Sequence, residues 1–171
     1  MTIISASAAA SATAPLPLGS NPEPSAAIFA AASLLMPHLE RGDRVDAATL
    51  RAAMEAAFGA SDATGAWDWK TAYDACETAT VLFLRKYGKA LFRKAETPAA
   101  RLSALTKIAG LLPTHTRRSA ESQTFQQFST PIPLGLVATH AAAITPADRV
   151  LEPSAGTGLL AILAEIAGGA L

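Results

Sequence analysis

Seven consecutive residues near the end of the sequence are of the types that hold a small charged ligand. Two apolar residues, Val150 and Leu151, precede them and an alanine- and leucine-rich segment follows, so the pattern predicts a strand, a glycine turn and a helix. Glycine lets a ligand approach the backbone where a Cβ would clash, and the N–H groups at the start of a helix suit an anion. The turn consists of Glu152, Pro153, Ser154, Ala155, Gly156, Thr157 and Gly158.

Two common nucleotide-binding motifs can be compared with this turn by their spacing. A phosphate-binding P-loop needs lysine and then serine or threonine after its glycines, whereas Leu159 and Leu160 follow Gly158, so binding of a nucleoside triphosphate is disfavoured. A dinucleotide fold needs Gly-x-Gly-x-x-Gly or alanine in the last position, and Ala161 satisfies this, so spacing alone leaves it open. The acidic residue and proline that open the turn are the discriminating feature.

Other catalytic or metal-binding patterns are missing from the sequence. His38, His115 and His140 lie far apart along the chain and match no metal-ligand spacing. Ser154 does not stand in the Gly-x-Ser-x-Gly pattern of a nucleophile elbow. The single cysteine, Cys76, excludes a disulfide framework and a cysteine-rich zinc site. The sequence therefore predicts no catalytic residue and no metal site.

Residues 152–158 resemble the first motif of S-adenosylmethionine-dependent methyltransferases of the adenine-specific DNA type, which has the form acidic-Pro-small-x-Gly-x-Gly. Residues 126–144, QQFSTPIPLGLVATHAAAI, look like the motif that precedes the glycine strand in this class: an aromatic residue, a small residue, Thr-Pro and an amphipathic helix. In this order, the two motifs are similar to the N-terminal part of bacterial strawberry-notch-like methylase/helicase proteins. The likeness covers about residues 117–165, and the helical part before them has a looser likeness.

The resemblance implies a site for the methionyl end of S-adenosylmethionine. Glu152 would hold the methionyl ammonium group, because a carboxylate is the natural partner of that cation. Thr130, with the backbone near Phe128 and Ser129, would contact the methionyl carboxylate. The glycines would allow the loop to lie against the amino-acid portion of the cofactor. The cofactor-binding residues implied in this way are Thr130, Glu152, Pro153, Ser154, Ala155, Gly156 and Gly158.

The resemblance also implies that the chain holds only the first βα unit of a Rossmann-like methyltransferase fold. We expect a truncated domain, without the second strand, whose acidic residue grips the ribose, and without the Asn/Asp-Pro-Pro-aromatic loop that holds the flipped adenine. No Pro-Pro dipeptide occurs in the sequence. The expected function is therefore that of the N-terminal part of a DNA adenine methyltransferase/helicase. Under this interpretation, the full-length protein transfers the methyl group to DNA. We expect this chain to need the rest of the polypeptide as a partner and to be inactive alone.

The middle of the chain carries an excess of positive charge. The whole sequence has 14 lysines and arginines and 14 acidic residues, but nine of the basic and one of the acidic residues fall within residues 85–118. A local excess of this kind neutralises phosphates even in a chain of zero net charge, so DNA is an expected partner; a solvated helix face is the alternative. The candidate nucleic-acid residues are Arg85, Lys86, Lys89, Arg93, Lys94, Arg117 and Arg118.

The composition predicts a mostly α fold. Alanine accounts for 40 of the 171 residues and 6% are aromatic, which favours helices over an all-β fold. Residues 25–40 predict a first helix, bent at Pro37. A second helix is expected with Asp46 as its N-cap and Gly59 in the left-handed conformation after its last residue.

Two further helices are expected before the glycine turn. The longest begins near Trp67 or Asp68 and ends before Gly88, and a fourth begins at Thr97 and Pro98, a capping hydroxyl followed by proline. Side chains at three- and four-residue steps place a stripe along one face of the longest helix, and such a stripe is typical of core rather than of a cofactor site. The stripe is Trp69, Tyr73, Cys76, Thr80, Phe83 and Tyr87.

The pattern divides the chain into three parts. Residues 1–24 are rich in serine, alanine and proline and predict disorder; residues 25–117 predict a helical domain; residues 118–171 predict the start of the methyltransferase domain. No stretch approaches the roughly 18 apolar residues of a membrane helix. A signal peptide has a basic residue before its apolar segment, and no basic residue precedes the small apolar run within the first 14 residues. We therefore expect a cytoplasmic protein that does not interact with membranes.

An alternative function from another class stays open at this point. The alanine-rich helices can instead form a module that binds nucleic acid or a protein partner, with a vestigial glycine turn. A steep salt dependence of DNA binding would favour the methyltransferase hypothesis, whereas salt-insensitive binding of a protein partner would favour a protein-interaction module.

Overall fold

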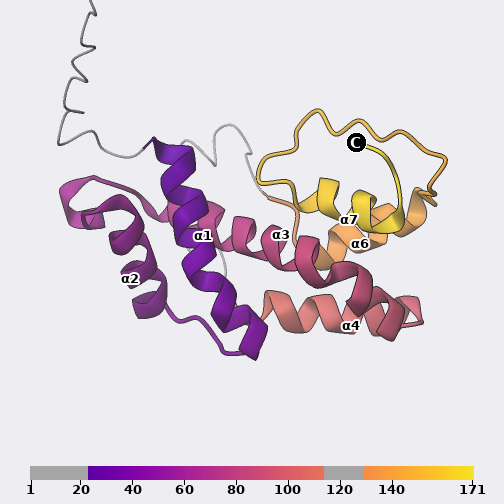
Figure 1. The fold of residues 1–171 in the computed structure, drawn as a ribbon, viewed down its shortest axis with the longest axis horizontal. Helices are drawn as coiled ribbons and strands as arrows, with labels where there is room; N and C mark the ends of the chain where they lie inside the picture. The colour runs from indigo at the N-terminus through magenta and orange to yellow at the C-terminus, as the bar shows by residue number, and fades with distance from the viewer. Residues whose placement is uncertain (1–22, 114–128) are drawn as a thin grey trace, which may run out of the picture.

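A computed structural model describes residues 23–113 and 129–171 of the chain, and these residues are mostly helical, as predicted (Figure 1). Within them, a single parallel bridge is present in place of strands. The elements are α1 Pro24–Arg41, α2 Ala47–Phe58, the 3-10 helix η1 Asp62–Thr64, α3 Trp69–Lys94, α4 Pro98–Ala109, α6 Ile132–Ala141 and α7 Leu159–Ala167.

The expected signals at the helix ends are confirmed. Asp46 caps α2, since its side chain accepts a hydrogen bond from the Thr49 N–H at 2.8 Å, and Gly59 ends that helix at a φ of 73°. Thr97 caps α4 in the same way, and Pro98 is the first residue of that helix. The first helix, α1, continues through Pro37 to Arg41.

The longest helix, α3, does not end before Gly88 as predicted. It runs for 26 residues from Trp69 to Lys94, a length of about 39 Å. Gly88 lies inside it because α7 comes close there: a Cβ at this position would lie 2.4 Å from Cδ1 of Ile166. The glycine that looks like a helix end in the sequence is therefore a contact point between two helices.

One hydrophobic core lies where α1 and α2 pack on the N-terminal half of α3 (Figure 1). Leu35, Leu50 and Met54 are fully buried in it. Most of the predicted stripe on α3 is confirmed as core: Tyr73, Cys76 and Thr80 are buried. Trp69 and Phe83 pack half-buried against the core, whereas Tyr87 lies outside it. Burial raises the pKa of the Cys76 thiol to about 12, with a smaller contribution from Glu77, so this thiol stays protonated and unreactive at neutral pH.

A second hydrophobic core joins the C-terminal half of α3 to α4, α6 and α7. Leu84 of α3 and Leu105 of α4 are fully buried there, and Leu163 of α7 is 1% exposed. Because α3 spans both cores, it positions the helices that follow residue 129 relative to those that precede it. The described residues contain no helix long and apolar enough to cross a membrane.

The predicted strand at Val150 and Leu151 does not form. The Val150 N–H donates to the Ala170 carbonyl at 2.7 Å and the Ala170 N–H donates to the Asp148 carbonyl at 3.0 Å, which makes a single parallel bridge between residues 149 and 170. A strand needs a ladder of such bonds, and Leu151 is 87% exposed because no further strand in the described ranges covers it. The Rossmann-like βα unit expected here is therefore not supported.

Several sequence predictions fall outside the described ranges. These are the disorder of the N-terminal segment up to residue 22 and the domain boundary at residue 118. Glu23 and Pro24 lie inside the described range and form the start of α1: Glu23 is its N-cap, and Pro24 is its first residue. The three-part division of the chain stays a prediction.

The cap of α3 predicts a measurable pH dependence. The Asp68 carboxylate accepts hydrogen bonds from the N–H and hydroxyl of Thr71 at 2.8 and 2.7 Å. Partial burial raises the pKa of Asp68, but these hydrogen bonds outweigh it and the net pKa lies below its usual value. A carboxyl with a lowered pKa stabilises the fold above its unfolded-state pKa, and this stabilisation is lost as the pH falls through the lowered value.

We therefore expect Asp68→Ala to lower the free energy of unfolding by about 1 kcal/mol at neutral pH. The difference between Asp68→Ala and the wild type should shrink as the pH falls to about 3, as measured by urea unfolding. Asp68→Asn is the matched variant, because it keeps a capping oxygen that does not titrate. A constant difference across the pH range would contradict the assignment.

Candidate functional site

The glycine loop, residues 152–158, connects the parallel bridge to α7. Gly156 and Gly158 have φ values of 52° and 91°, in the left-handed region that disfavours other residues. A Cβ on Gly158 would meet no atom within 4 Å, and on Gly156 only the Ser154 carbonyl oxygen at 3.9 Å. The loop therefore presents an open strip of backbone that leads into the first turn of α7.

The Glu152 side chain turns back onto its own loop. Its Oε1 accepts a hydrogen bond from the Ser154 N–H at 3.0 Å, which fixes the carboxylate at the start of the loop. Oε2 has no hydrogen-bond or ion-pair partner among the described residues, and the side chain is half-buried. One carboxylate oxygen is therefore held in position while the other is available to a cation.

A hydrogen bond that the sequence did not indicate ties the loop to α3. The Thr157 hydroxyl donates to Oε2 of Glu77 at 2.8 Å, across 80 residues of sequence. Glu77 is 9% exposed, and a buried carboxylate requires donors of this kind. An acidic residue amid small and apolar neighbours on the helix was the available signal, but nothing in the sequence identified its donor.

Thr130 lies at the same end of the α6 and α7 pair as the glycine loop. Near the start of α6, a Cβ on Gly135 would touch Leu160 and Leu163 of α7 at 3.0 Å each. At the end of α6, His140 lines a cavity together with Ala167, the last residue of α7. The two helices therefore run side by side in the same direction. Thr130 is exposed, and no hydrogen bond joins it to the loop.

The remaining residues assigned to the cofactor lie on the surface of the loop. Pro153, Ser154 and Ala155 are exposed, and the Ala155 carbonyl accepts a hydrogen bond from the Gly158 N–H at 2.7 Å, which closes the turn before α7. The structure thus brings the implied cofactor residues to one end of α7. The hydrogen bond from this loop to α3 comes from Thr157, which the sequence had not assigned to the site.

The predicted basic block does not form one continuous unpaired surface. Lys86 points to α1 and pairs with Glu40 at 2.8 Å, and Tyr87 donates to the same carboxylate oxygen at 2.9 Å. The hydrogen bond from Lys86 holds the pKa of Glu40 below its usual value. Arg85 lies 3.8 Å from Glu165 of α7 and is largely exposed.

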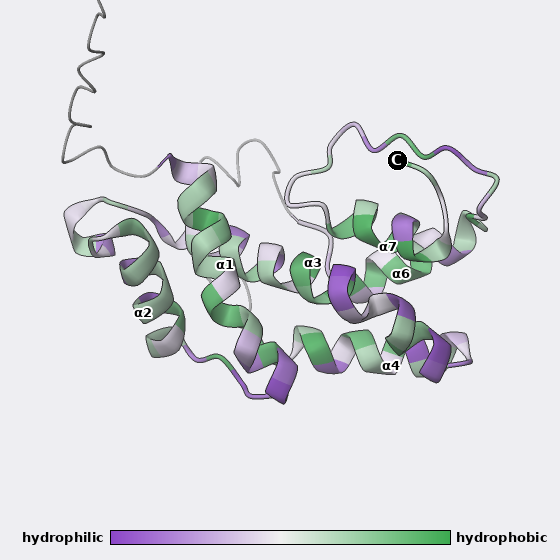
Figure 2. Cartoon of the chain, in the orientation of Figure 1, coloured by the Kyte–Doolittle hydropathy of each residue, from purple (hydrophilic) through white to green (hydrophobic). Residues whose placement is uncertain are grey.

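The other candidate cations on α3 lie toward its C-terminal end, where Figure 2 shows strongly hydrophilic residues. Lys89, Arg93 and Lys94 are exposed and form no ion pair within the described part of the chain. Arg117 and Arg118 lie outside the described residues. Three of the seven candidate cations are thus available in the structure at one end of one helix.

Comparisons with known proteins identify no relative of the chain. No family model, no curated protein and no solved structure matches the chain. A functional proposal therefore has to be argued from the geometry of the glycine loop and from the charged residues at the C-terminal end of α3.

Proposed function

We propose that the chain is the N-terminal part of an S-adenosylmethionine-dependent DNA adenine methyltransferase/helicase-type protein, in which the glycine loop holds the methionyl end of the cofactor. The proposal rests on one arrangement: a fixed carboxylate at Glu152 lies at one end of a loop whose two glycines leave the backbone open before α7. The methionyl group is a zwitterion, so it needs an acidic group for its ammonium and N–H donors for its carboxylate.

The first turn of α7 can supply N–H donors for the methionyl carboxylate. The first N–H groups of a helix have no acceptor within the helix, and the helix dipole favours an anion there. Gly158 caps α7 without a side chain, so no capping oxygen competes for these N–H groups. Thr130 lies at the same end and adds a hydroxyl. In this arrangement, Glu152 binds the ammonium and the start of α7 faces the carboxylate.

The proposed nucleotide-binding fold has one feature in common with the described residues, the parallel pairing that flanks α7. Residues 149 and 170 flank α7 and pair in parallel, through the hydrogen bonds of Ala170 to Asp148 and of Val150 to Ala170. Parallel strands joined through a helix are the repeating unit of Rossmann-like sheets. In the proposed fold, further hydrogen bonds on either side of residues 149 and 170 would extend this bridge into two parallel strands.

Calorimetric titration of S-adenosylmethionine into the 171-residue chain tests the proposal. We expect millimolar binding, because the proposed contacts involve only the methionyl end of the cofactor. Glu152→Gln should weaken it about tenfold, since it removes the charge but keeps the hydrogen bond to Ser154. Glu165→Gln on α7 is the matched control and should leave affinity unchanged. Equal losses in both variants, or no binding by the wild type, would contradict the proposal.

The DNA-binding half of the proposal predicts which cations matter. Replacing Arg93 and Lys94 together by glutamine is expected to weaken duplex binding and to lower the slope of log affinity against log salt by about 2. Lys86→Gln should have a much smaller effect, because Lys86 is already paired with Glu40. Fluorescence anisotropy of a labelled duplex over a range of salt concentrations measures both. Binding that does not respond to salt would favour a protein-interaction module instead.

A further inference from the structure

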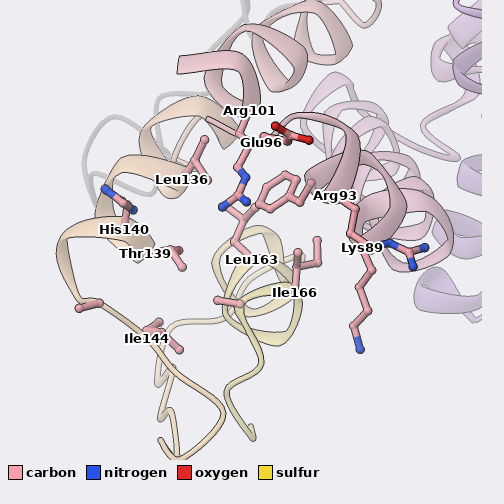
Figure 3. Close-up of a pocket in the computed structure, with 13 residues that line it drawn as sticks. Lys89, Arg93, Glu96, Arg101, Leu136, Thr139, His140, Ile144, Leu163 and Ile166 are labelled. Atoms are coloured by element: carbon pink, nitrogen blue, oxygen red, sulfur yellow. The ribbon is translucent and has the colours of Figure 1, made fainter. Parts of the chain in front are cut away.

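A cavity of about 830 Å³ lies between the C-terminal ends of α3, α6 and α7 and the start of α4, away from the glycine loop (Figure 3). Its volume is in the range of sites that hold small molecules. The floor is apolar and is formed by Phe92, Leu136, Ile144, Leu163 and Ile166. Leu136 and Leu163 are buried in the second core, so the floor is a fixed surface.

Arg101 is held in place above this floor. Its Nε donates to the Ala95 carbonyl at 2.9 Å, and its guanidinium carbon lies 5.2 Å from the centre of the Phe92 ring. Figure 3 shows the side chain reaching over the cavity toward Leu163. The two Nη groups have no partner among the described residues. Arg101 is therefore a partly buried cation whose position is fixed by two contacts and whose donors face the cavity.

The rim of the cavity adds more positive charge than negative. Lys89 and Arg93 line it from α3, and neither forms an ion pair with a described residue. Glu96 is the single carboxylate in the lining. Thr139 donates its hydroxyl hydrogen to the Gly135 carbonyl at 2.9 Å, so its oxygen remains an acceptor. Lys89 and Arg93 therefore add positive potential at one edge of the cavity, and an anion bound beside Arg101 is attracted by it.

We propose that this cavity binds a small organic anion, whose apolar body lies on the apolar floor and whose phosphate or carboxylate group is held by Arg101, with Lys89 and Arg93 adding positive potential at the rim. A guanidinium presents paired donors that match two oxygens of either group. A free inorganic anion would leave the floor exposed to water, whereas an uncharged hydrocarbon would leave the cations unpaired. The site is separate from the proposed cofactor site, which lies at the opposite end of α7.

Titration of the 171-residue chain with 1-naphthyl phosphate, followed by amide chemical shifts, tests this proposal. We expect shifts in residues 89–101, 136–144 and 163–167, and binding about tenfold or more tighter than that of inorganic phosphate or of 1-naphthol. The naphthoate analogue identifies the preferred anionic group, and binding of either analogue at these residues supports the site. Shifts confined to other residues, or inorganic phosphate binding as tightly as the naphthyl ester, would overturn it.

Two variants and a matched control keep the test specific. Arg101→Leu should weaken binding about tenfold while it keeps apolar volume over the floor. Lys89→Gln, which removes an exposed charge at the rim, should weaken binding less than Arg101→Leu does. Lys107→Leu, on the same helix as Arg101 but outside the cavity, should have no effect. Equal effects of all three would overturn the proposal. So would shifts of the lining residues by a duplex oligonucleotide when the naphthyl ester causes none, because the cations would then serve the DNA backbone.

Loss of S-adenosylmethionine binding in Glu152→Gln with unchanged naphthyl phosphate binding would show that the two sites are independent. The proposal for the cavity therefore stands or fails separately from the proposed cofactor site.

Discussion

Truncation of Leu84 to alanine is expected to lower the free energy of unfolding by about 2–5 kcal/mol. Leu84 is fully buried in the second core, where α3 meets α4, α6 and α7. Loss of its side chain removes apolar burial and leaves a cavity among residues of four helices, which cannot all move in to fill it. Urea unfolding followed by circular dichroism measures the loss.

The matched control for Leu84 is Leu134 on α6, which is 60% exposed. Leu134→Ala should change the free energy of unfolding by less than about 0.5 kcal/mol. A second readout is hydrogen exchange in α7, which should accelerate in Leu84→Ala because this helix packs on α3 through the second core. Similar losses in the two variants would show that this core does not hold the helices together.

Substitution of alanine for Gly158 is expected to weaken both the fold and cofactor binding. Gly158 has a φ of 91°, and a side chain in this region costs about 1–2 kcal/mol. No atom lies within 4 Å of its Cβ position, so the methyl group would project into the space assigned to the cofactor. We expect affinity for S-adenosylmethionine to fall about tenfold, measured by calorimetry.

Gly42 offers a closely matched control for this substitution. It also has a positive φ, 74°, and open space at its Cβ position, but it lies after α1, far from the glycine loop along the chain. Gly42→Ala should cost a similar amount of stability and leave cofactor affinity unchanged. If both variants lose affinity equally, the loss reflects stability, and the loop is not the binding surface.

Features of the fold that depend on neighbouring residues were predictable from the sequence. Asp46 and Thr97 cap helices through the N–H group three positions later, and Gly59 ends a helix through its own backbone. The stripe on α3 follows from helical period alone, since residues three and four apart share a face. These predictions are confirmed because each depends on a few consecutive residues.

Features that depend on distant contacts were not predictable. The sequence could not reveal that Gly88 makes room for Ile166, so the end of α3 was placed too early. The hydrogen bond from Thr157 to Glu77 joins residues 80 positions apart, and no local pattern indicates it. The predicted strand at residues 150 and 151 failed for the same reason, since a strand requires a partner ladder and the described ranges supply one bridge.

The candidate site was predicted in part. The loop residues were identified from their order, and the structure adds the positive φ values at the two glycines and the fixed Glu152 carboxylate. The basic block was identified by composition, but charge counts do not show pairing. Lys86 is held by Glu40, whereas Arg101, which the charge pattern did not single out, faces a cavity.

The central claim, that the glycine loop holds the methionyl end of S-adenosylmethionine, is tested most directly by mapping amide chemical shifts. The chain is titrated separately with S-adenosylmethionine, with S-adenosylhomocysteine and with adenosine, which lacks the amino-acid portion. We predict that the first two shift the resonances of residues 152–161, and that adenosine does not. Shifts by adenosine equal to those of the cofactor, or no shifts in this segment at millimolar ligand, would contradict the claim.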